Sequence, residues 1–204
     1  MKNLLIIGAG GHGKVCYEIA LNMKKWDTIN FLDDFKTGKI LDSTIIGKSE
    51  SIDFNPDEAD IFIAIGDNYK RETLHTKFIT LGYRIPTLIS TCSYISKYCF
   101  LGEGTVVMNN SIINTSAHIS RGCIINSGSI LEHDSVIGEF CHVSPGSVIL
   151  GGVHIGDFTW IGANATIKNN VEIASNSVIG AGAVVVKNIS EEGIYVGLPA
   201  KKIK

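Results

Sequence analysis

The sequence predicts a chain of two parts, a small α/β domain over residues 1–85 and a β-solenoid over residues 90–204. Two observations predict this fold class. A glycine-rich turn follows the first apolar segment and an acidic pair follows the second, which is typical of a βαβ unit. The second half carries an aliphatic residue at every sixth position, a period that fits neither a single helix nor an alternating strand.

The aliphatic series has sixteen members and no break: Ile95, Leu101, Val107, Ile113, Ile119, Ile125, Leu131, Ile137, Val143, Ile149, Ile155, Ile161, Ile167, Ile173, Ile179 and Val185. Four residues after the first fifteen members stands a small or short side chain. Three residues after the members, eleven of sixteen positions are Gly or Asn. Because Gly and Asn adopt positive φ readily, each hexapeptide is expected to hold a short strand and a turn.

Three such strands close a triangular coil of about 18 residues, and successive coils stack at roughly 4.8 Å. Sixteen hexapeptides make a little over five coils, or roughly 25 Å of prism. The aliphatic residues are expected to point inward, and the residue before each of them outward. Cys99, Cys123 and Cys141 stand in the column of small residues, so we interpret them as structural thiols.

The first 85 residues are expected to contain strand–helix units. The elements that the pattern predicts are strands over 2–7, 28–32, 60–65 and 84–88, and helices over 14–25 and from about 68 to 81. The first turn reads Gly8-Ala9-Gly10-Gly11-His12-Gly13, and Asp33-Asp34 follow the second strand. The glycines let the backbone approach a phosphate, and a helix N-terminus donates N–H groups to it.

This glycine spacing is found more commonly in NAD-binding Rossmann domains, which are therefore the alternative interpretation. The segment is too short for both mononucleotide-binding halves, and no other part of the chain has the pattern of a domain for hydride chemistry. A half-sized domain suits one nucleotide better than two. A nucleotide-linked sugar is therefore the favoured ligand of this domain.

Bulk properties exclude several classes of protein. The chain has 204 residues, a net charge of -2 and no basic run, which argues against nucleic acid as a partner. No apolar stretch reaches membrane-spanning length, and no signal peptide precedes the first strand. Five cysteines without a CxxC motif indicate a reduced, cytoplasmic protein.

The two halves resemble a known family. The hexapeptide series and the closing Gly197-Leu198-Pro199-Ala200-Lys201 resemble the left-handed parallel β-helix and tail of hexapeptide-repeat acyltransferases. The whole chain resembles the branch of sugar acetyltransferases that includes the bacillosamine-pathway and perosamine N-acetyltransferases and the sialic acid O-acetyltransferase-like proteins. The matching residues are those at 8–13, Asp33-Asp34, Ile65-Gly66-Asp67-Asn68 with Arg71, Glu132-His133-Asp134, and His142-Val143-Ser144-Pro145.

The resemblance implies several properties beyond the residue patterns. It implies a left-handed solenoid, although parallel crossovers are generally right-handed. It implies an N-terminal Rossmann-like domain that holds a nucleotide-sugar acceptor and a prism that holds acetyl-CoA as co-substrate, with no metal. It also implies a homotrimer, with acetyl-CoA in the groove between adjacent prisms.

His133 is the candidate general base. It lies close to a turn, and Asp134 beside it can fix the imidazole tautomer. Gly151 stands one coil further on, where a backbone N–H without a shielding side chain could stabilise an oxyanion. The hypothesis is that His133, polarised by Asp134, takes a proton from a sugar amine that attacks the thioester, while Gly151 holds the tetrahedral intermediate. The family match gives His133 and Asp134 the same roles.

A second group of residues is predicted to contact the cofactor. His142 lies half a coil from His133, so one chain does not easily bring the two together, and we expect His142 to reach the site from a neighbouring subunit. Trp160 lies one coil above His142 and is a candidate to pack on the pantetheine arm. Ala163 and Ala181 are expected to line a shallow outer column above Gly151, along which that arm could run.

The acceptor is predicted to bind the first domain. The candidate contacts are the phosphate loop with its histidine, the acidic pair, and the turn after the third strand: Gly10, Gly11, His12, Asp33, Asp34, Gly66, Asn68 and Arg71. The alternative interpretation is that the acidic pair only caps its strand, and that the last two residues only stabilise their turn.

The favoured function is N-acetylation of a nucleotide-linked, UDP-4-amino sugar in surface glycan biosynthesis. O-acetylation of a sugar such as sialic acid uses the same base and stays open. Gamma-type carbonic anhydrases use the same prism with histidine ligands, but His118 and His154 share one face and His142 lies on another. A non-catalytic nucleotide-binding protein is the third alternative.

Overall fold

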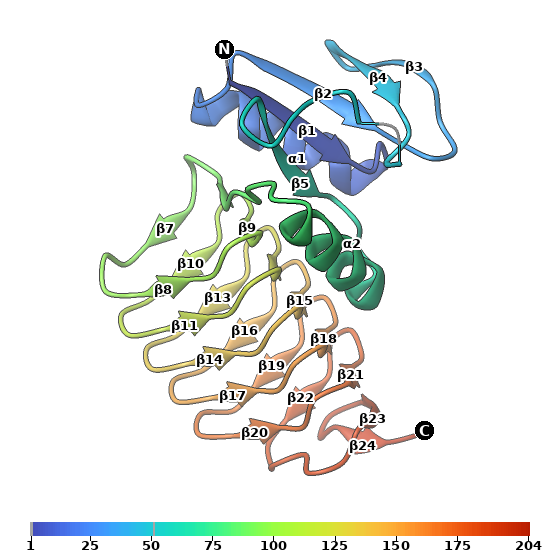
Figure 1. Ribbon diagram of the computed structural model, residues 1–204. Coiled ribbons are helices and arrows are strands. Elements are labelled where there is room, and N and C mark those ends of the chain that lie inside the picture. Colours follow the sequence, from blue (N-terminus) through green and yellow to red (C-terminus); the bar gives the residue numbers. More distant parts are fainter. Residues whose placement is uncertain (1, 51) are drawn as a thin grey trace. The chain divides into compact units, whose positions relative to one another are not determined.

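The computed structural model describes residues 2–50 and 52–204 and contains two units, Met1–Thr91 and Cys92–Lys204 (Figure 1). The domain limits inferred from the sequence, residues 85 and 90, stay a prediction. Among the described residues, no helix has the length and apolar character that crossing a membrane requires.

The first unit is built on a five-stranded sheet with the order β3-β4-β2-β1-β5. All neighbouring strands are parallel except β3 and β4, which form a hairpin. Its elements are β1 (Asn3–Ile7), α1 (Gly11–Met23), β2 (Thr28–Leu32), β3 (Gly38–Ile40), β4 (Ser43–Gly47), β5 (Ala59–Ile63), α2 (Asn68–Thr80) and β6 (Leu88–Ile89). Strands β1 and β5 are buried along almost their whole length, as expected for the core of a parallel sheet.

The prediction of this unit is confirmed for β1, β2, β5 and both helices, within a few residues at their ends. The hairpin of β3 and β4 was not predicted. The strand predicted over 84–88 is wrong except for its last residue, which begins β6. Pro86 lacks an N–H and cannot donate to a sheet, and the Arg84 side chain instead binds Asp60, with Nε 2.8 Å from Oδ1.

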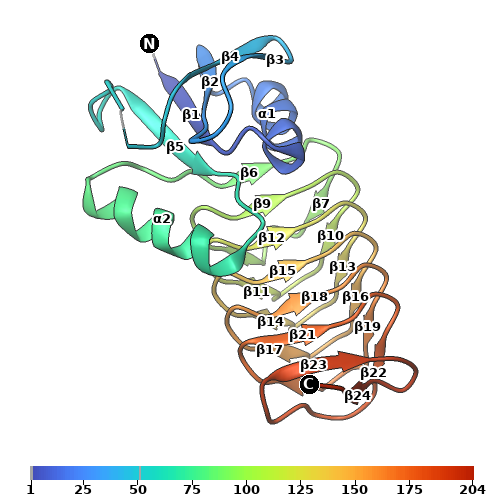
Figure 2. The same ribbon diagram turned by 90° about the vertical axis from the view of Figure 1, so that its right-hand side faces the viewer.

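The second unit is a three-sided prism whose sheets are called sides I, II and III here, and their strands are parallel except for the antiparallel last pair of side III (Figure 2). Side I consists of β7 (Tyr94–Ile95), β10 (Ile112–Ile113), β13 (Ile130–Leu131), β16 (Val148–Ile149), β19 (Thr166–Ile167) and β22 (Val184–Val185). Side II consists of β8 (Phe100–Leu101), β11 (His118–Ile119), β14 (Val136–Ile137), β17 (His154–Ile155) and β20 (Glu172–Ile173). Side III contains β9 (Val106–Val107), β12 (Ile124–Ile125), β15 (His142–Val143), β18 (Trp160–Ile161), β21 (Ser177–Ile179), β23 (Gly193–Val196) and β24 (Lys201–Lys202).

The aliphatic series fills the inside of the prism, as predicted. From Val107 to Val185 each member is at most 3% exposed, and burying each such side chain contributes roughly 1.5–3 kcal/mol. Partners in neighbouring strands, such as Leu131 and Ile149, are eighteen residues apart. Three hexapeptides therefore make one coil, and residues that share a side or a corner recur every third hexapeptide.

Each corner of the prism turns through a left-handed residue three positions after the aliphatic one. From Gly104 to Gly182 all fourteen of these positions have φ between 52° and 69°. Gly and Asn account for most of them, as the sequence predicts, but Ser116, Asp134, Phe140 and Phe158 adopt the same conformation. The repeat therefore imposes this geometry even on residues for which it has a conformational cost.

Candidate active site

His133 and Asp134 lie at a corner between sides I and II, directly after β13. The left-handed backbone of Asp134, with φ of 60°, turns the chain there. Its Oδ2 atom lies 2.7 Å from His133 Nδ1, and both side chains are more than half exposed. Because Nδ1 is held by the carboxylate, Nε2 is the ring nitrogen left to exchange a proton with a substrate.

Gly151 lies one coil from His133 at the same corner. The two coils are joined by the Gly152 N–H, which donates to His133 O at 3.0 Å. A Cβ atom on Gly151 would lie only 2.7 Å from both Cε1 and Nε2 of His133. With the ring in this position only glycine fits beside it, and no described residue accepts a hydrogen bond from the Gly151 N–H.

Glu132 flanks His133 on the other side but takes no part in this contact. Its Oε2 accepts a hydrogen bond from Asn114 Nδ2 at 2.9 Å, one coil earlier. Of the two carboxylates beside His133, only Asp134 therefore orients the imidazole.

His142 lies on the outer face of side III, one coil below Trp160, as predicted. The two rings stack at 6.0 Å, and Trp160 Nε1 donates to Ser144 Oγ at 2.8 Å. Asn126 Oδ1 accepts from the Ser127 N–H, which leaves Asn126 Nδ2 facing His142 Nε2 at 3.1 Å. Since an amide nitrogen only donates, this network puts the neutral His142 proton on Nδ1.

The predicted position of Ala163 and Ala181 is wrong. They do not lie above Gly151 but stack with Pro145 at the corner between sides III and I, as the hydrogen bonds Asn164 N–H to Pro145 O and Gly182 N–H to Ala163 O show. Ala163 is twelve residues beyond Gly151, and only residues eighteen apart share a corner. Both alanines therefore adjoin the side that carries His142 and Trp160.

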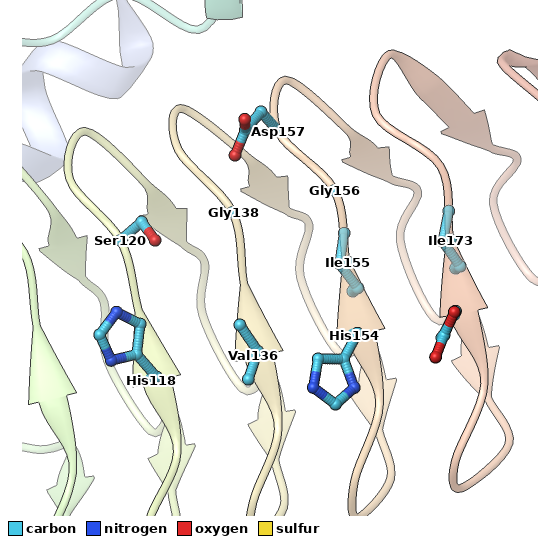
Figure 3. A pocket seen from close by; sticks show the side chains of 10 residues that line it. His118, Ser120, Val136, Gly138, His154, Ile155, Gly156, Asp157 and Ile173 are labelled. Carbon is cyan, nitrogen blue, oxygen red and sulfur yellow. The ribbon is translucent and has the colours of Figure 1, made fainter.

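His118 and His154 project from side II, with Val136 of β14 between them (Figure 3). They line a shallow pocket of about 580 Å³. The His118 ring stacks on Phe100 at 4.5 Å, whereas His154 Nδ1 lies 3.2 Å from Gly152 O. The described residues hold no group of three or more His, Cys, Asp or Glu side chains with the geometry of a metal site.

The glycine-rich loop of the first unit contains two kinds of glycine. A Cβ on Gly13 would lie 1.9 Å from Gly8 O, and one on Gly8 would lie 2.8 Å from Ala64 O, so both are required for packing. A Cβ on Gly10 or Gly11 would meet no atom within 4 Å, so these two residues face open space at the start of α1. No described residue accepts a hydrogen bond from the Gly10 or Gly11 N–H, so both amides are open to an anionic group.

The acidic pair after β2 is engaged in local structure. Asp33 accepts hydrogen bonds from the N–H groups of Ala9 at 2.7 Å, Phe35 at 3.0 Å and Lys36 at 2.9 Å, while Lys36 Nζ donates to Ala9 O. Burial favours the neutral carboxyl, but these donors outweigh it and hold the pKa of Asp33 below its usual value. Asp34 accepts from Ser49 N–H and Oγ. Both carboxylates also line a pocket of about 450 Å³.

Arg71 is 1% exposed and lies in the first turn of α2, beyond the carboxyl end of β5. Its Nη1 donates to Ile65 O at 3.0 Å and Gly66 O at 3.1 Å, and its Nη2 donates to Asn68 Oδ1 at 2.8 Å. Burial and the Arg71 charge together lower the pKa of His12 to about 4. His12 is therefore neutral at neutral pH, and the fold brings it into the electrostatic range of a buried cation.

Sequence reasoning missed three contacts around these sites. They are the Asn126 hydrogen bond to His142, the Asn114 hydrogen bond to Glu132 and the Asp33 contact with the glycine-rich loop. The first two follow from coil register, because the partners are 16 and 18 residues apart. No signal in the sequence marks the third.

A glycine-rich α/β unit followed by a prism with a corner His–Asp pair defines a hexapeptide-repeat transferase. Residues 3–78 match the PglD N-terminal domain, and residues 152–187 match the bacterial transferase hexapeptide of six repeats. Over 113 residues the chain is 34% identical to the UDP-N-acetylbacillosamine N-acetyltransferase of Bacillus subtilis. That match covers 53% of this chain and 52% of the relative, about half the length of each.

Solved structures extend the likeness to the whole chain. The acetyltransferase domain of PglB from Neisseria gonorrhoeae, also solved in complex with acetyl coenzyme A, is 33% identical with a TM-score of 0.96, over 98% of this chain and 99% of that chain for the uncomplexed form. PerB from Caulobacter crescentus, in complex with CoA and GDP-perosamine, is 31% identical with a TM-score of 0.91, over 99% and 97%. The chain belongs to this family of acetyl-CoA-dependent nucleotide-sugar N-acetyltransferases.

Proposed function

We propose that this protein transfers the acetyl group of acetyl-CoA to the amine of a nucleotide-linked amino sugar, with His133 as the general base. The observation that carries the proposal is the His133 corner, where Nδ1 lies 2.7 Å from the Asp134 carboxylate and the ring lies against Gly151. This arrangement supplies an oriented base and an adjacent amide donor, which are the two needs of acyl transfer.

In the proposed reaction the amine nitrogen forms a bond to the thioester carbonyl carbon while His133 Nε2 accepts the amine proton. The Gly151 N–H donates to the oxygen that becomes negative, and Asp134 stabilises the protonated imidazole. The carbon–sulfur bond then breaks. Coenzyme A leaves as a thiolate that takes the proton from His133, and the amide product forms.

The nucleotide of the acceptor is proposed to bind the first unit. Gly10 and Gly11 leave room for a phosphate, and Arg71 supplies a nearby positive charge. His12, neutral at neutral pH, adds a hydrogen-bonding group, and Gly66 and Asn68 adjoin Arg71. Asp33 and Asp34 remain candidates for the nucleoside, in addition to their local hydrogen bonds.

Acetyl-CoA is proposed to bind between two prisms of a homotrimer. His133 and Gly151 lie at the corner of sides I and II, whereas His142 and Trp160 lie on side III and Ala163 and Ala181 at its border with side I. Within one chain these two sets of residues lie apart. A groove between neighbouring prisms can bring them together. The five cysteines are all free, as is typical of proteins in a reducing compartment. A cytoplasmic location is therefore part of the proposal.

The test is incubation of the protein with acetyl-CoA and a panel of UDP-, GDP- and dTDP-linked amino sugars, with the product followed by mass spectrometry. We expect one acetyl group to be added to the amine of at least one acceptor. Transfer to the hydroxyl of sialic acid alone, with every amino sugar unchanged, would contradict the proposal.

A further inference from the structure

The small residues that follow each aliphatic residue by four positions form an inner column at each corner of the prism. Six of them donate a side-chain hydrogen bond to the backbone carbonyl fifteen residues further on. The pairs are Thr105 and Ser120, Ser111 and Asn126, Cys123 and Gly138, Cys141 and Gly156, Ser147 and Gly162, and Thr159 and Ala174, at 2.9–3.2 Å. These bonds tie the corner of one coil to the corner of the next.

Ser135 stands directly after Asp134 in the inner column of the corner between sides I and II, whereas the six bonded residues lie at the other two corners. Its side chain is 0% exposed, and its Oγ atom has no hydrogen-bond partner among the residues that the structure describes. The same fifteen-residue offset, applied to this corner, pairs Ser135 with the Leu150 carbonyl. Within the described chain, neither Ser135 Oγ nor the Val153 N–H donates to that carbonyl, although the Ser135 N–H donates to Glu132 O three residues earlier. A buried hydroxyl without a partner is costly and calls for an explanation.

The Leu150 carbonyl belongs to the same peptide group as the Gly151 N–H. That N–H is the donor proposed to hold the oxyanion, so the inference rests on the proposed function. A carbonyl that accepts a hydrogen bond polarises its peptide group and makes the attached N–H a stronger donor. Among the described residues, Ser135 is the one inner-column residue whose hydroxyl has no partner. It is in register with the Leu150–Gly151 peptide group, whose N–H is proposed to take part in the reaction.

We infer that Ser135 is a positioning residue for the oxyanion donor. Its hydroxyl donates to the Leu150 carbonyl as negative charge develops at the Gly151 N–H. The bond orients and polarises this peptide group. Because the bond is absent from the structure and forms with the developing charge, it stabilises the transition state more than the bound substrate. It therefore acts on kcat and not on the KM for acetyl-CoA.

The chain itself suggests a matched pair of variants. Val153 and Val171 occupy the inner column at the same corner, so a β-branched side chain fits there. Ser135→Thr keeps the hydroxyl and Ser135→Val has the same shape without it. Thr105→Val is the control from another corner, because it removes an inner-column bond that is made in the structure.

The experiment measures kcat, the KM for acetyl-CoA and the unfolding midpoint in denaturant for all three variants. We expect Ser135→Val to lower kcat about tenfold at unchanged KM, as for loss of one hydrogen bond in the transition state. Ser135→Thr should stay within about twofold of the native kcat. The unfolding midpoint should not fall in Ser135→Val, but it should fall in Thr105→Val, whose kcat stays native.

The inference is overturned when Ser135→Val keeps the native kcat, or when Ser135→Thr loses as much activity as Ser135→Val. A native protein that transfers no acetyl group to any acceptor contradicts the proposed function itself. An active native protein with an equally active Ser135→Val variant contradicts only the role of Ser135, so the two failures are distinguishable.

Discussion

The His133 corner and the glycine-rich loop place their functional groups in opposite ways. The side chains of His133 and Asp134 are 60% and 65% exposed. The core of the prism fixes their backbone, but the stability of the core does not depend on these two side chains. Around the loop the candidate ligands are also part of the fold, since Arg71 at the start of α2 is buried and Asp33 after β2 accepts hydrogen bonds from three backbone N–H groups. Substitutions at the corner should therefore change the rate, whereas substitutions at the loop should change stability as well as acceptor binding.

The largest effect is expected for His133→Asn. Loss of a general base costs roughly 10²–10⁴-fold in rate, so kcat should fall at least about 100-fold. Because the side chain is exposed, the free energy of unfolding should change by no more than about 0.5 kcal/mol. Initial rates at saturating substrates and denaturant unfolding measure the two quantities. A variant that loses stability as well as rate would break the contrast between the two regions.

Gly151→Ala tests the packing of the same corner. A methyl group 2.7 Å from two atoms of the His133 ring must displace the ring from its contact with Asp134. We expect kcat to fall about 10- to 100-fold, since a small misplacement of a catalytic group has effects of this order. Steady-state kinetics measure the loss. Native kcat in this variant would show that the position of the ring beside Gly151 is not required.

Arg71→Met tests the opposite behaviour in the first unit, at the start of α2. It removes the donors to Ile65 O, Gly66 O and Asn68 Oδ1, and hydrogen bonds to a charged group contribute roughly 1.5–3 kcal/mol. We expect the free energy of unfolding to fall by about 2–3 kcal/mol and the KM for the acceptor to rise. Lys70→Met, on the exposed face of α2, is the matched control. Unfolding of both variants at the native midpoint would refute the structural role of Arg71.

The last prediction concerns the pH dependence of stability, where the effect is confined to acidic solution. The pKa of His12 is lowered to about 4 from its ordinary 6.5, so the unfolded chain takes up the proton first as the pH falls. Stability should therefore decrease between pH 6.5 and 4, and the stability of His12→Asn should decrease less over this window. Denaturant midpoints across the window measure the difference. Identical curves for both proteins would show that His12 is not desolvated.

The architecture of the prism was predictable from the sequence because a strict repeat needs no long-range information. The inward series and the left-handed corners follow from residue size and from Gly and Asn. Ala163 and Ala181 were predicted above Gly151, but they are twelve and thirty residues beyond it, and only multiples of eighteen share a corner. The left-handed Phe140 and Phe158 were not predictable, since only the neighbouring coils force this backbone on an aromatic residue.

The first unit was less predictable because its details depend on contacts between distant segments. The β3–β4 hairpin is largely exposed, so it leaves no apolar pattern. The Asp33 contact with Ala9 joins residues 24 apart through a single carboxylate. At the candidate site the sequence predicted which residues gather at the His133 corner. The unpaired Ser135 hydroxyl has no counterpart in the sequence pattern, because only the register of the coils reveals it.

The central claim is that one active site combines His133 of one chain with side III of another. The direct measurement is the rate of acetyl transfer in a co-expressed mixture of His133→Asn and His142→Ala chains, purified through two different tags. Purification through both tags removes trimers of a single chain type, so about a third of the sites in the remaining trimers hold both native histidines. We expect the mixture to exceed the mean rate of the two variants assayed alone. A rate equal to that mean would contradict a site shared between chains.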